Sequence, residues 1–307
     1  MTIGIPQALP YYHHNILWET FFKELDIPYV LSAPSTQKTI ANGTRYANDE
    51  TCLAYKLYMG HVASLVEKSD RILVPYFRKL GPQNEFCVRF WGLFDTVAST
   101  FPDAKLLSYS LNSRKKNAEL HGFLKLGKEL GKSHKNTVWA YRLGKQAQKR
   151  ENQARFLHMR EKLQSKKQKV LLAGQDYLTQ DPLIGKMIQK ELSNLGVEVL
   201  SVDAWELSKR NLQSEKIAPK LYWHKSREIL GAIEQGRYQV DAVILLTAFP
   251  CGVDCLTNDL VLMQVKNIPI LQLLIDEHEG REGLITRLES FIDLINAKEN
   301  THILEAV

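Results

Sequence analysis

The stretch VDAVILLTAFPCGVDC (Val240–Cys255) joins a nearly continuous apolar run to a glycine-containing segment with two cysteines. A run such as Val240–Pro250 is typical of a central strand of a parallel sheet, which is buried on both faces. In an open α/β sheet, ligands gather at the carboxyl ends of strands and at the amino ends of the helices that follow. Cys251 follows directly on the predicted strand, and Cys255 lies in the next loop or first helical turn. The stretch therefore predicts an α/β fold with two thiols at the edge of a sheet.

Short apolar runs alternate with helical patterns on both sides of this stretch. Further strands are predicted at Thr2–Pro6, Pro28–Ser32, Arg71–Phe77, Ala104–Leu111, Gln168–Gly174, Val197–Asp203 and Ile268–Asp276. Helices are predicted to begin near Asn15, Cys52 and Cys87 and to lie within 182–196, 226–236 and 282–297. Alternation of this kind implies parallel sheets with right-handed crossover connections.

The strand signals stop between Asn112 and Lys167, where the helix-prone stretch KQAQKRENQARFLHMREKLQ stands out. A chain of 307 residues is also too long for most single cores. We therefore predict two Rossmann-like α/β domains with parallel sheets, over residues 1–111 and 168–307, joined by a helical connection over residues 112–167.

The composition is that of an ordinary globular protein, with 44% hydrophobic and 24% charged residues. No apolar run reaches the length that crosses a bilayer, and MTIGIPQALPYYHHN lacks the basic and apolar regions of a signal peptide. These features predict a cytoplasmic protein without a membrane partner. Thiols stay reduced in that compartment, so buried, metal-bound or catalytic cysteines are favoured over disulfides.

The net charge of +6 is concentrated in one segment. Arg142–Lys169 contains ten Lys and Arg residues against two Glu, Glu151 and Glu161. A solvated helix face, a nucleic-acid patch and a docking site for an acidic protein are the possible interpretations. No RNA-recognition signature, zinc-finger spacing or aromatic-interleaved basic groove accompanies the segment. We therefore interpret it as a solvated helix face and predict no nucleic-acid partner.

The four cysteines all flank predicted strand ends or helix starts, and none lies inside a strand. Helix amino ends stabilise anions, so they suit thiolates and an anionic cluster held by them. The spacing, with 34, 163 and 3 residues between successive cysteines, fits no zinc-finger pattern and no compact cluster-binding run. Cysteine also packs often as a small buried residue. The residues alone therefore leave two interpretations of the four cysteines open, structural thiols and a metal site.

Five segments, in family order, resemble the 2-hydroxyacyl-CoA dehydratase and acyl-CoA dehydratase activase-related family of iron–sulfur proteins, and its small single-chain branch in particular. They are IGIPQALPYYHHNILWETFFKELDI, DETCLAYKLYMGHVASLVEK, NEFCVRFWGLFDT, TAFPCGVDCLTNDL and DEHEGREGLITRLESFIDLI. The resemblance implies a [4Fe-4S] cluster in the cleft between the domains, with Cys52, Cys87 and Cys251 matching its cysteine ligands. Cys255 departs from the family pattern and is a candidate fourth ligand, which would close an iron otherwise open to substrate.

The resemblance also implies a partner, an ATPase activator with its own iron–sulfur cluster, which delivers low-potential electrons. The chain has neither GxGxxG nor GxxxxGK[ST], so we do not expect it to hydrolyse ATP itself. The implied function is reductive chemistry on an acyl-CoA or another small molecule, as a reductase or dehydratase component of anaerobic metabolism, or onward electron transfer. A homo- or hetero-oligomer is compatible with this function. The competing hypothesis is a non-redox binding or scaffold module, for acyl-CoA or a protein partner, with structural thiols or zinc.

Four further residues are candidates for proton transfer. His13 and His14 follow the first predicted strand, and histidine titrates near neutrality, although solvent-exposed polar residues at a helix start are the plainer interpretation. Glu277 and His278 follow the last predicted strand. They are either part of a helix start or proton-relay groups beside the cluster ligands.

Overall fold

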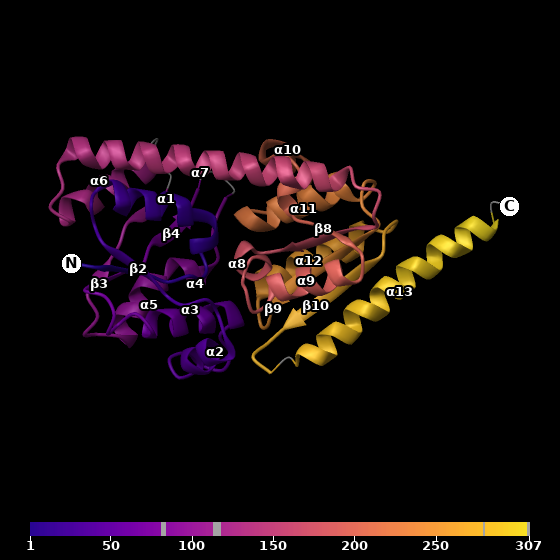
Figure 1. Ribbon diagram of the computed structural model, residues 1–307, viewed down its shortest axis with the longest axis horizontal. Coiled ribbons are helices and arrows are strands. Elements are labelled where there is room, and N and C mark those ends of the chain that lie inside the picture. The colour runs from indigo at the N-terminus through magenta and orange to yellow at the C-terminus, as the bar shows by residue number, and fades with distance from the viewer. Residues whose placement is uncertain (81–83, 113–117, 279, 306–307) are drawn as a thin grey trace. The chain divides into compact units, whose positions relative to one another are not determined.

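The computed structural model describes residues 1–80, 84–112, 118–278 and 280–305, with side chains to residue 297 (Figure 1). The chain divides into two compact units. Unit 1 comprises Met1–Ala154 and the short segment Leu221–Lys225, and unit 2 comprises Arg155–Lys220 and Ser226–Val307. The chain therefore passes from one unit to the other three times.

Unit 1 is built on a four-stranded parallel sheet with the strand order β2-β1-β3-β5. Its strands are β1 (Ile3–Ile5), β2 (Tyr29–Leu31), β3 (Arg71–Leu73) and β5 (Leu106–Leu107). A separate parallel pair, β4 (Tyr76–Lys79) and β6 (Ser110–Asn112), continues in the same direction. The single strands predicted at Arg71–Phe77 and Ala104–Leu111 are therefore each divided in two. Pro75 lies at the break between β3 and β4, and proline has no N–H group to donate to a sheet.

Seven helices begin in unit 1 within the described residues. They are α1 (Tyr11–Glu24), α2 (Gln37–Thr44), α3 (Leu53–Ala63), α4 (Val88–Trp91), α5 (Leu93–Thr100), α6 (Ala118–Glu129) and α7 (His134–Leu163). The predicted helices after Cys52 and Cys87 are confirmed as α3 and α4. The first helix begins at Tyr11, four residues earlier than predicted. The helices α6 and α7 fill most of the stretch predicted as a helical connection, and α7 continues into unit 2.

Unit 2 has its own four-stranded parallel sheet, with the order β10-β9-β7-β8. Its strands are β7 (Lys169–Gly174), β8 (Glu198–Leu200), β9 (Ala242–Ala248) and β10 (Ile270–Ile275). Its remaining elements are α8 (Asp176–Thr179), α9 (Gly185–Asn194), η1 (Val202–Ala204), α10 (Leu207–Ser214), α11 (His224–Gly236, from Ser226 on), α12 (Gly252–Gln264) and α13 (Arg281–Glu305). All residues of β9 are buried, which confirms the central strand predicted from Val240–Pro250.

The two sheets share one topology. When the strands are numbered along the sequence within each unit, both sheets have the order 2-1-3-4. The second strand is therefore added on one side of the first strand and the third strand on its other side, and we call the position between the first and third strands the reversal point. This α/β arrangement with only parallel pairing confirms the predicted fold class. Ligand sites in such folds lie at the carboxyl ends of the strands beside that reversal point. In unit 2, the reversal point lies between β7 and β9. None of the described helices is long and apolar enough to span a membrane.

Buried His61, on α3, makes the stability of unit 1 depend on pH. Its Nδ1 and Nε2 atoms lie 2.8 Å from Ser32 Oγ and 3.0 Å from Ser35 Oγ, respectively. Burial lowers the pKa of His61 from 6.5 to about 4. The folded state therefore takes up a proton less readily than the unfolded state, and stability falls as the pH drops below 6.5.

We expect wild-type protein to lose about 2 kcal/mol of unfolding free energy through His61 between pH 7.5 and pH 5. The His61→Gln variant should lack this part of the pH dependence. Urea unfolding of both proteins at the two pH values measures the change in unfolding free energy. The contribution of the other titrating groups is the same in both proteins and cancels when the two changes are compared. An equal loss in both proteins would contradict the prediction.

Candidate functional site

Three of the four cysteines are the N-cap residues of helices. Cys52 precedes α3, Cys87 precedes α4 and Cys251 precedes α12, each with an extended backbone. In none of them does the side chain accept a hydrogen bond from the first helical turn. The positive end of a helix favours negative charge, so a helix start is a suitable place for an anionic ligand.

Cys87 and Cys251 hold equivalent positions in the two units. Each begins the helix that follows the third strand of its sheet, β3 with its continuation β4 in unit 1 and β9 in unit 2. Cys251 lies near the carboxyl end of β9, beside the reversal point of its sheet. This placement agrees with the sequence-based expectation for the residues that follow Val240–Pro250.

The helix starts that carry Cys52 and Cys87 approach each other through an aromatic contact. Tyr55 lies in the first turn after Cys52, and the Arg89 guanidinium lies 5.7 Å from its ring centroid. Burial raises the pKa of Tyr55, the Arg89 charge lowers it and Cys52 raises it slightly, so both groups lie near this ring. Arg89 thus places a cation at the first turn of the helix that follows Cys52, which the sequence pattern did not indicate.

The two thiols of unit 2 lie in the first turn of α12. The N–H group of Cys255 donates to the carbonyl oxygen of Cys251, 3.0 Å away, as one helical turn requires. Cys255 is exposed, whereas Cys251 is partly buried. Burial raises the pKa of the Cys255 thiol, and the carboxylates of Asp254 and Asp259 raise it further. Without a metal, Cys255 is therefore less ready to ionise than an ordinary thiol.

Buried Asp254 adjoins Cys251. Its side chain is 3% exposed, and its Oδ1 atom accepts a hydrogen bond of 2.7 Å from Gln175 Nε2. Burial raises the pKa of Asp254 to about 6, although hydrogen bonds from Gln175 and the Cys251 thiol oppose the rise. Neither Asp254 nor Gln175 was expected from the sequence. Gln175 directly follows β7, so the rule that sites lie at strand ends could have found it.

Two more buried polar pairs hold α12 in place. The hydroxyl oxygens of Thr257 and Ser226 lie 2.8 Å apart, and Asn258 Nδ2 donates to Thr247 Oγ1 at 2.7 Å. Thr247 belongs to β9 and Ser226 to α11, so both pairs link α12 to its neighbours in unit 2. They hold the middle of the helix, two and three residues beyond Cys255.

The histidine candidates lie in the first turn of α1. His13 is exposed, whereas His14 is 8% exposed and stacks between two rings. Its ring centroid lies 5.7 Å from that of Trp18 and 5.0 Å from that of Phe77. His14 therefore packs in the core of unit 1, in contrast to the exposed position expected for it.

Glu277 and His278 follow the carboxyl end of β10, as predicted. The N–H group of His278 donates to Asp276 Oδ1 at 2.7 Å, a turn that precedes the start of α13 at Arg281. Glu277 is partly buried and His278 is exposed. The structure places them at the same edge of the sheet as Cys251, because parallel strands end at a common edge.

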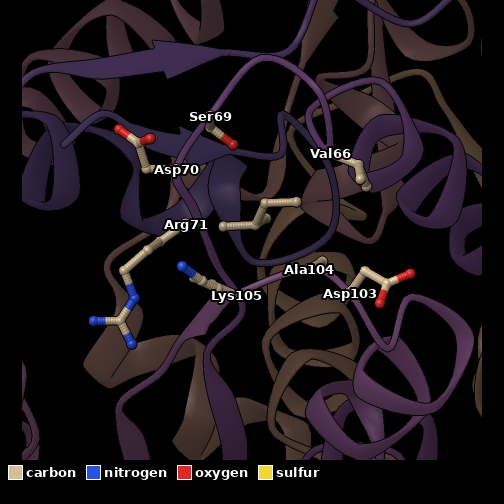
Figure 2. A pocket seen from close by; sticks show the side chains of 8 residues that line it. Val66, Ser69, Asp70, Arg71, Asp103, Ala104 and Lys105 are labelled. Carbon is tan, nitrogen blue, oxygen red and sulfur yellow. The ribbon is translucent and has the colours of Figure 1, made fainter.

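A shallow pocket lies at the opposite edge of the sheet of unit 1, near the amino ends of β3 and β5 (Figure 2). Figure 2 shows Asp70 and Arg71 on one side of it and Asp103 on the other. Asp70 accepts a hydrogen bond from the Thr2 N–H group, and Arg71 forms an ion pair with Glu129. Asp70 and Arg71 thus have partners within the fold, and the pocket contains none of the candidate residues.

Each unit thus supplies two thiols, Cys52 and Cys87 in unit 1 and Cys251 and Cys255 in unit 2. Over the described ranges, no three His, Cys, Asp or Glu side chains lie close enough together to hold a metal ion. The chemistry of the donors suits an iron–sulfur cluster, since cysteine thiolates are its usual protein ligands.

Comparison with solved structures gives only weak likenesses. The SBP FpvC from Pseudomonas aeruginosa in complex with Mn2+ is 13% identical, with 98% of this chain and 99% of that chain covered and a TM-score of 0.31. A sugar transporter from Clostridium phytofermentans is 10% identical, with 96% and 93% covered and a TM-score of 0.20. Neither likeness bears on function.

No curated protein matches the sequence. Residues 2–204 match the family described as CoA enzyme activase uncharacterised domain (DUF2229). The match includes Cys52 and Cys87 and ends before Cys251. Because it spans well over half of the 307 residues, the chain belongs to this CoA enzyme activase-related family.

Proposed function

We propose that this protein is a [4Fe-4S] redox protein related to the 2-hydroxyacyl-CoA dehydratases. It receives low-potential electrons from an ATP-hydrolysing activator that carries its own cluster, and it uses them for reductive chemistry or passes them on. The observation that carries the proposal is the placement of Cys52, Cys87 and Cys251, each at the N-cap of a helix. Membership of a CoA enzyme activase-related family supports the link to such an activator.

The residues of the chain have separate tasks in this function. Cys52, Cys87 and Cys251 bind iron as thiolates that the helix amino ends stabilise. Cys255 is the proposed fourth ligand. Arg89 offsets part of the negative charge near Cys52, and the Asp254–Gln175 pair fixes the start of α12. When bound, the cluster supplies one electron at a time at low potential.

Anaerobic purification with metal analysis tests the proposal. We expect a brown protein with about four iron and four sulfide per chain, as a single cubane requires, and an electron paramagnetic resonance signal after reduction. A colourless protein with zinc or without metal would refute the proposal and support the binding or scaffold module instead. Affinity for a CoA ester that persists without iron would also support that module.

The Cys255→Ser variant tests the fourth ligand. We expect it to retain its iron, because serine still offers an oxygen atom in place of the thiolate, but to show an altered resonance spectrum, because a hydroxyl is a poorer ligand than a thiolate. The matched control is Leu256→Ser, which alters the adjacent exposed residue of α12 and should leave the spectrum unchanged. Identical spectra in the wild type and in Cys255→Ser would show that Cys255 is only a neighbour of the cluster.

A further inference from the structure

A short segment from the second half of the chain is built into unit 1. The segment Leu221–Lys225, which we call the clasp, lies between α10 and the body of α11 in the sequence. The residues on both sides of the clasp in the sequence belong to unit 2, so the chain returns to unit 1 for these residues and then leaves it again. Such a detour requires specific contacts in unit 1.

The clasp holds the residues that immediately precede Cys87. The Glu85 N–H group donates to the Tyr222 carbonyl oxygen at 2.8 Å, and the His224 N–H group donates to the Glu85 carbonyl oxygen at 2.9 Å. His224 Nδ1 lies 3.4 Å from Asn84 Oδ1. The His224 ring centroid lies 5.9 Å from that of Phe86. Residues 84, 85 and 86 are thus each in contact with the clasp.

The clasp also continues directly into the elements that position Cys251. Ser226 follows Lys225, and its hydroxyl is hydrogen-bonded to that of buried Thr257 on α12 at 2.8 Å. Cys251 is the N-cap residue of that helix. A few residues of chain are therefore fixed at one end to the loop before Cys87 and at the other end to α12.

We propose that the clasp positions the Cys87 thiol and couples it to α12, so that a change at Thr257 alters the environment of Cys87. This inference deepens the proposed function, because it assigns a positioning role to residues outside the proposed ligand set. The coupling passes through covalent chain and hydrogen bonds, and it is present in the metal-free protein.

Alkylation of the reduced, metal-free chain tests the proposal. The His224→Pro variant removes the N–H group that binds Glu85, at the first residue of α11, where proline is compatible with a helix. The variant also removes the ring that contacts Phe86. We expect the alkylation rate of Cys87 by iodoacetamide, measured by peptide mass spectrometry, to rise at least about fivefold, since losing one hydrogen bond alone has about that effect on local opening. Cys52 in the same molecule should react at its wild-type rate.

The Thr257→Val variant tests the coupling from the other end. It removes the hydrogen bond to Ser226, so we expect faster alkylation of Cys87 although Thr257 belongs to unit 2. The control is Leu207→Pro, the same kind of substitution at the exposed first residue of α10, which should leave Cys87 unchanged. An unchanged Cys87 rate in either test variant, or an equal rise in the control, would overturn the proposal. Because no metal is present, iron content does not affect the outcome.

Discussion

Replacing Cys52, Cys87 or Cys251 with alanine is expected to abolish iron binding or to reduce it severely. Each substitution removes one of the proposed thiolate ligands, and alanine puts no donor atom in its place. A cubane left with too few cysteine ligands is exposed to loss of iron. Iron and sulfide per chain, measured after anaerobic reconstitution of each variant, check the prediction.

The same variants should fold normally without metal. None of the three side chains accepts a capping hydrogen bond from its helix, and in Cys251→Ala the buried Asp254 keeps its hydrogen bond from Gln175. We expect the metal-free variants to unfold within about 1 kcal/mol of the metal-free wild type, as is usual where no large interaction is removed. Full iron content in all three variants would refute the ligand assignment. Loss of iron together with loss of folding would require a milder substitution, such as serine.

The sequence pattern predicted the elements that carry the thiols because those elements are locally determined. Apolar residues three and four positions apart indicated α3, and the continuous apolar run indicated β9. The helix α2 was not predicted. Only Ile40 and Gly43 of this helix are buried, so it shows almost no apolar stripe, and its start depends on a capping box formed by Thr36 and Thr39.

The polarity of α12 shows where local patterns fail. Leu256, Leu262 and Met263 of this helix are exposed, whereas its buried face includes Asp254 and Thr257. A periodicity argument would place the apolar residues inside. The polar face is buried because each side chain finds a hydrogen-bond partner on another element of unit 2. The sequence could not identify partners so distant along the chain.

The clasp was unpredictable for the same reason. Its bonds to Glu85 join residues more than a hundred positions apart, and they involve backbone groups that every residue type carries. The burial of Asp254 was unpredictable too. Its place in the sequence is typical of an exposed acidic residue in a first helical turn, where the helix dipole favours negative charge. Its burial depends on Gln175, which only the folded sheet brings near.

The largest stability effect is expected where α2 crosses α3. The two helices meet at Gly43 and Gly60 with almost no space between their backbones. A β-carbon at Gly60 would lie 2.1 Å from the Thr39 carbonyl oxygen, and one at Gly43 would lie 1.8 Å from the Lys56 carbonyl oxygen. Alanine normally stabilises a helix interior by about 1 kcal/mol relative to glycine. Here the obstruction is backbone, so the helices must separate, and we expect Gly60→Ala to destabilise the protein by about 3 kcal/mol.

Urea unfolding of Gly60→Ala and a matched glycine variant measures this effect. The control is Gly283→Ala on α13, where a β-carbon would meet nothing within 4 Å and should raise stability by about 0.5 kcal/mol or more. The double variant Gly43→Ala/Gly60→Ala should be destabilised by less than the sum of the two single effects, because one separation of the helices relieves both obstructions. A stability gain in Gly60→Ala similar to that in Gly283→Ala would contradict the close crossing. The crossing matters for the site, because Gly60 lies on the helix that begins at Cys52, and a shifted α3 should also weaken iron binding.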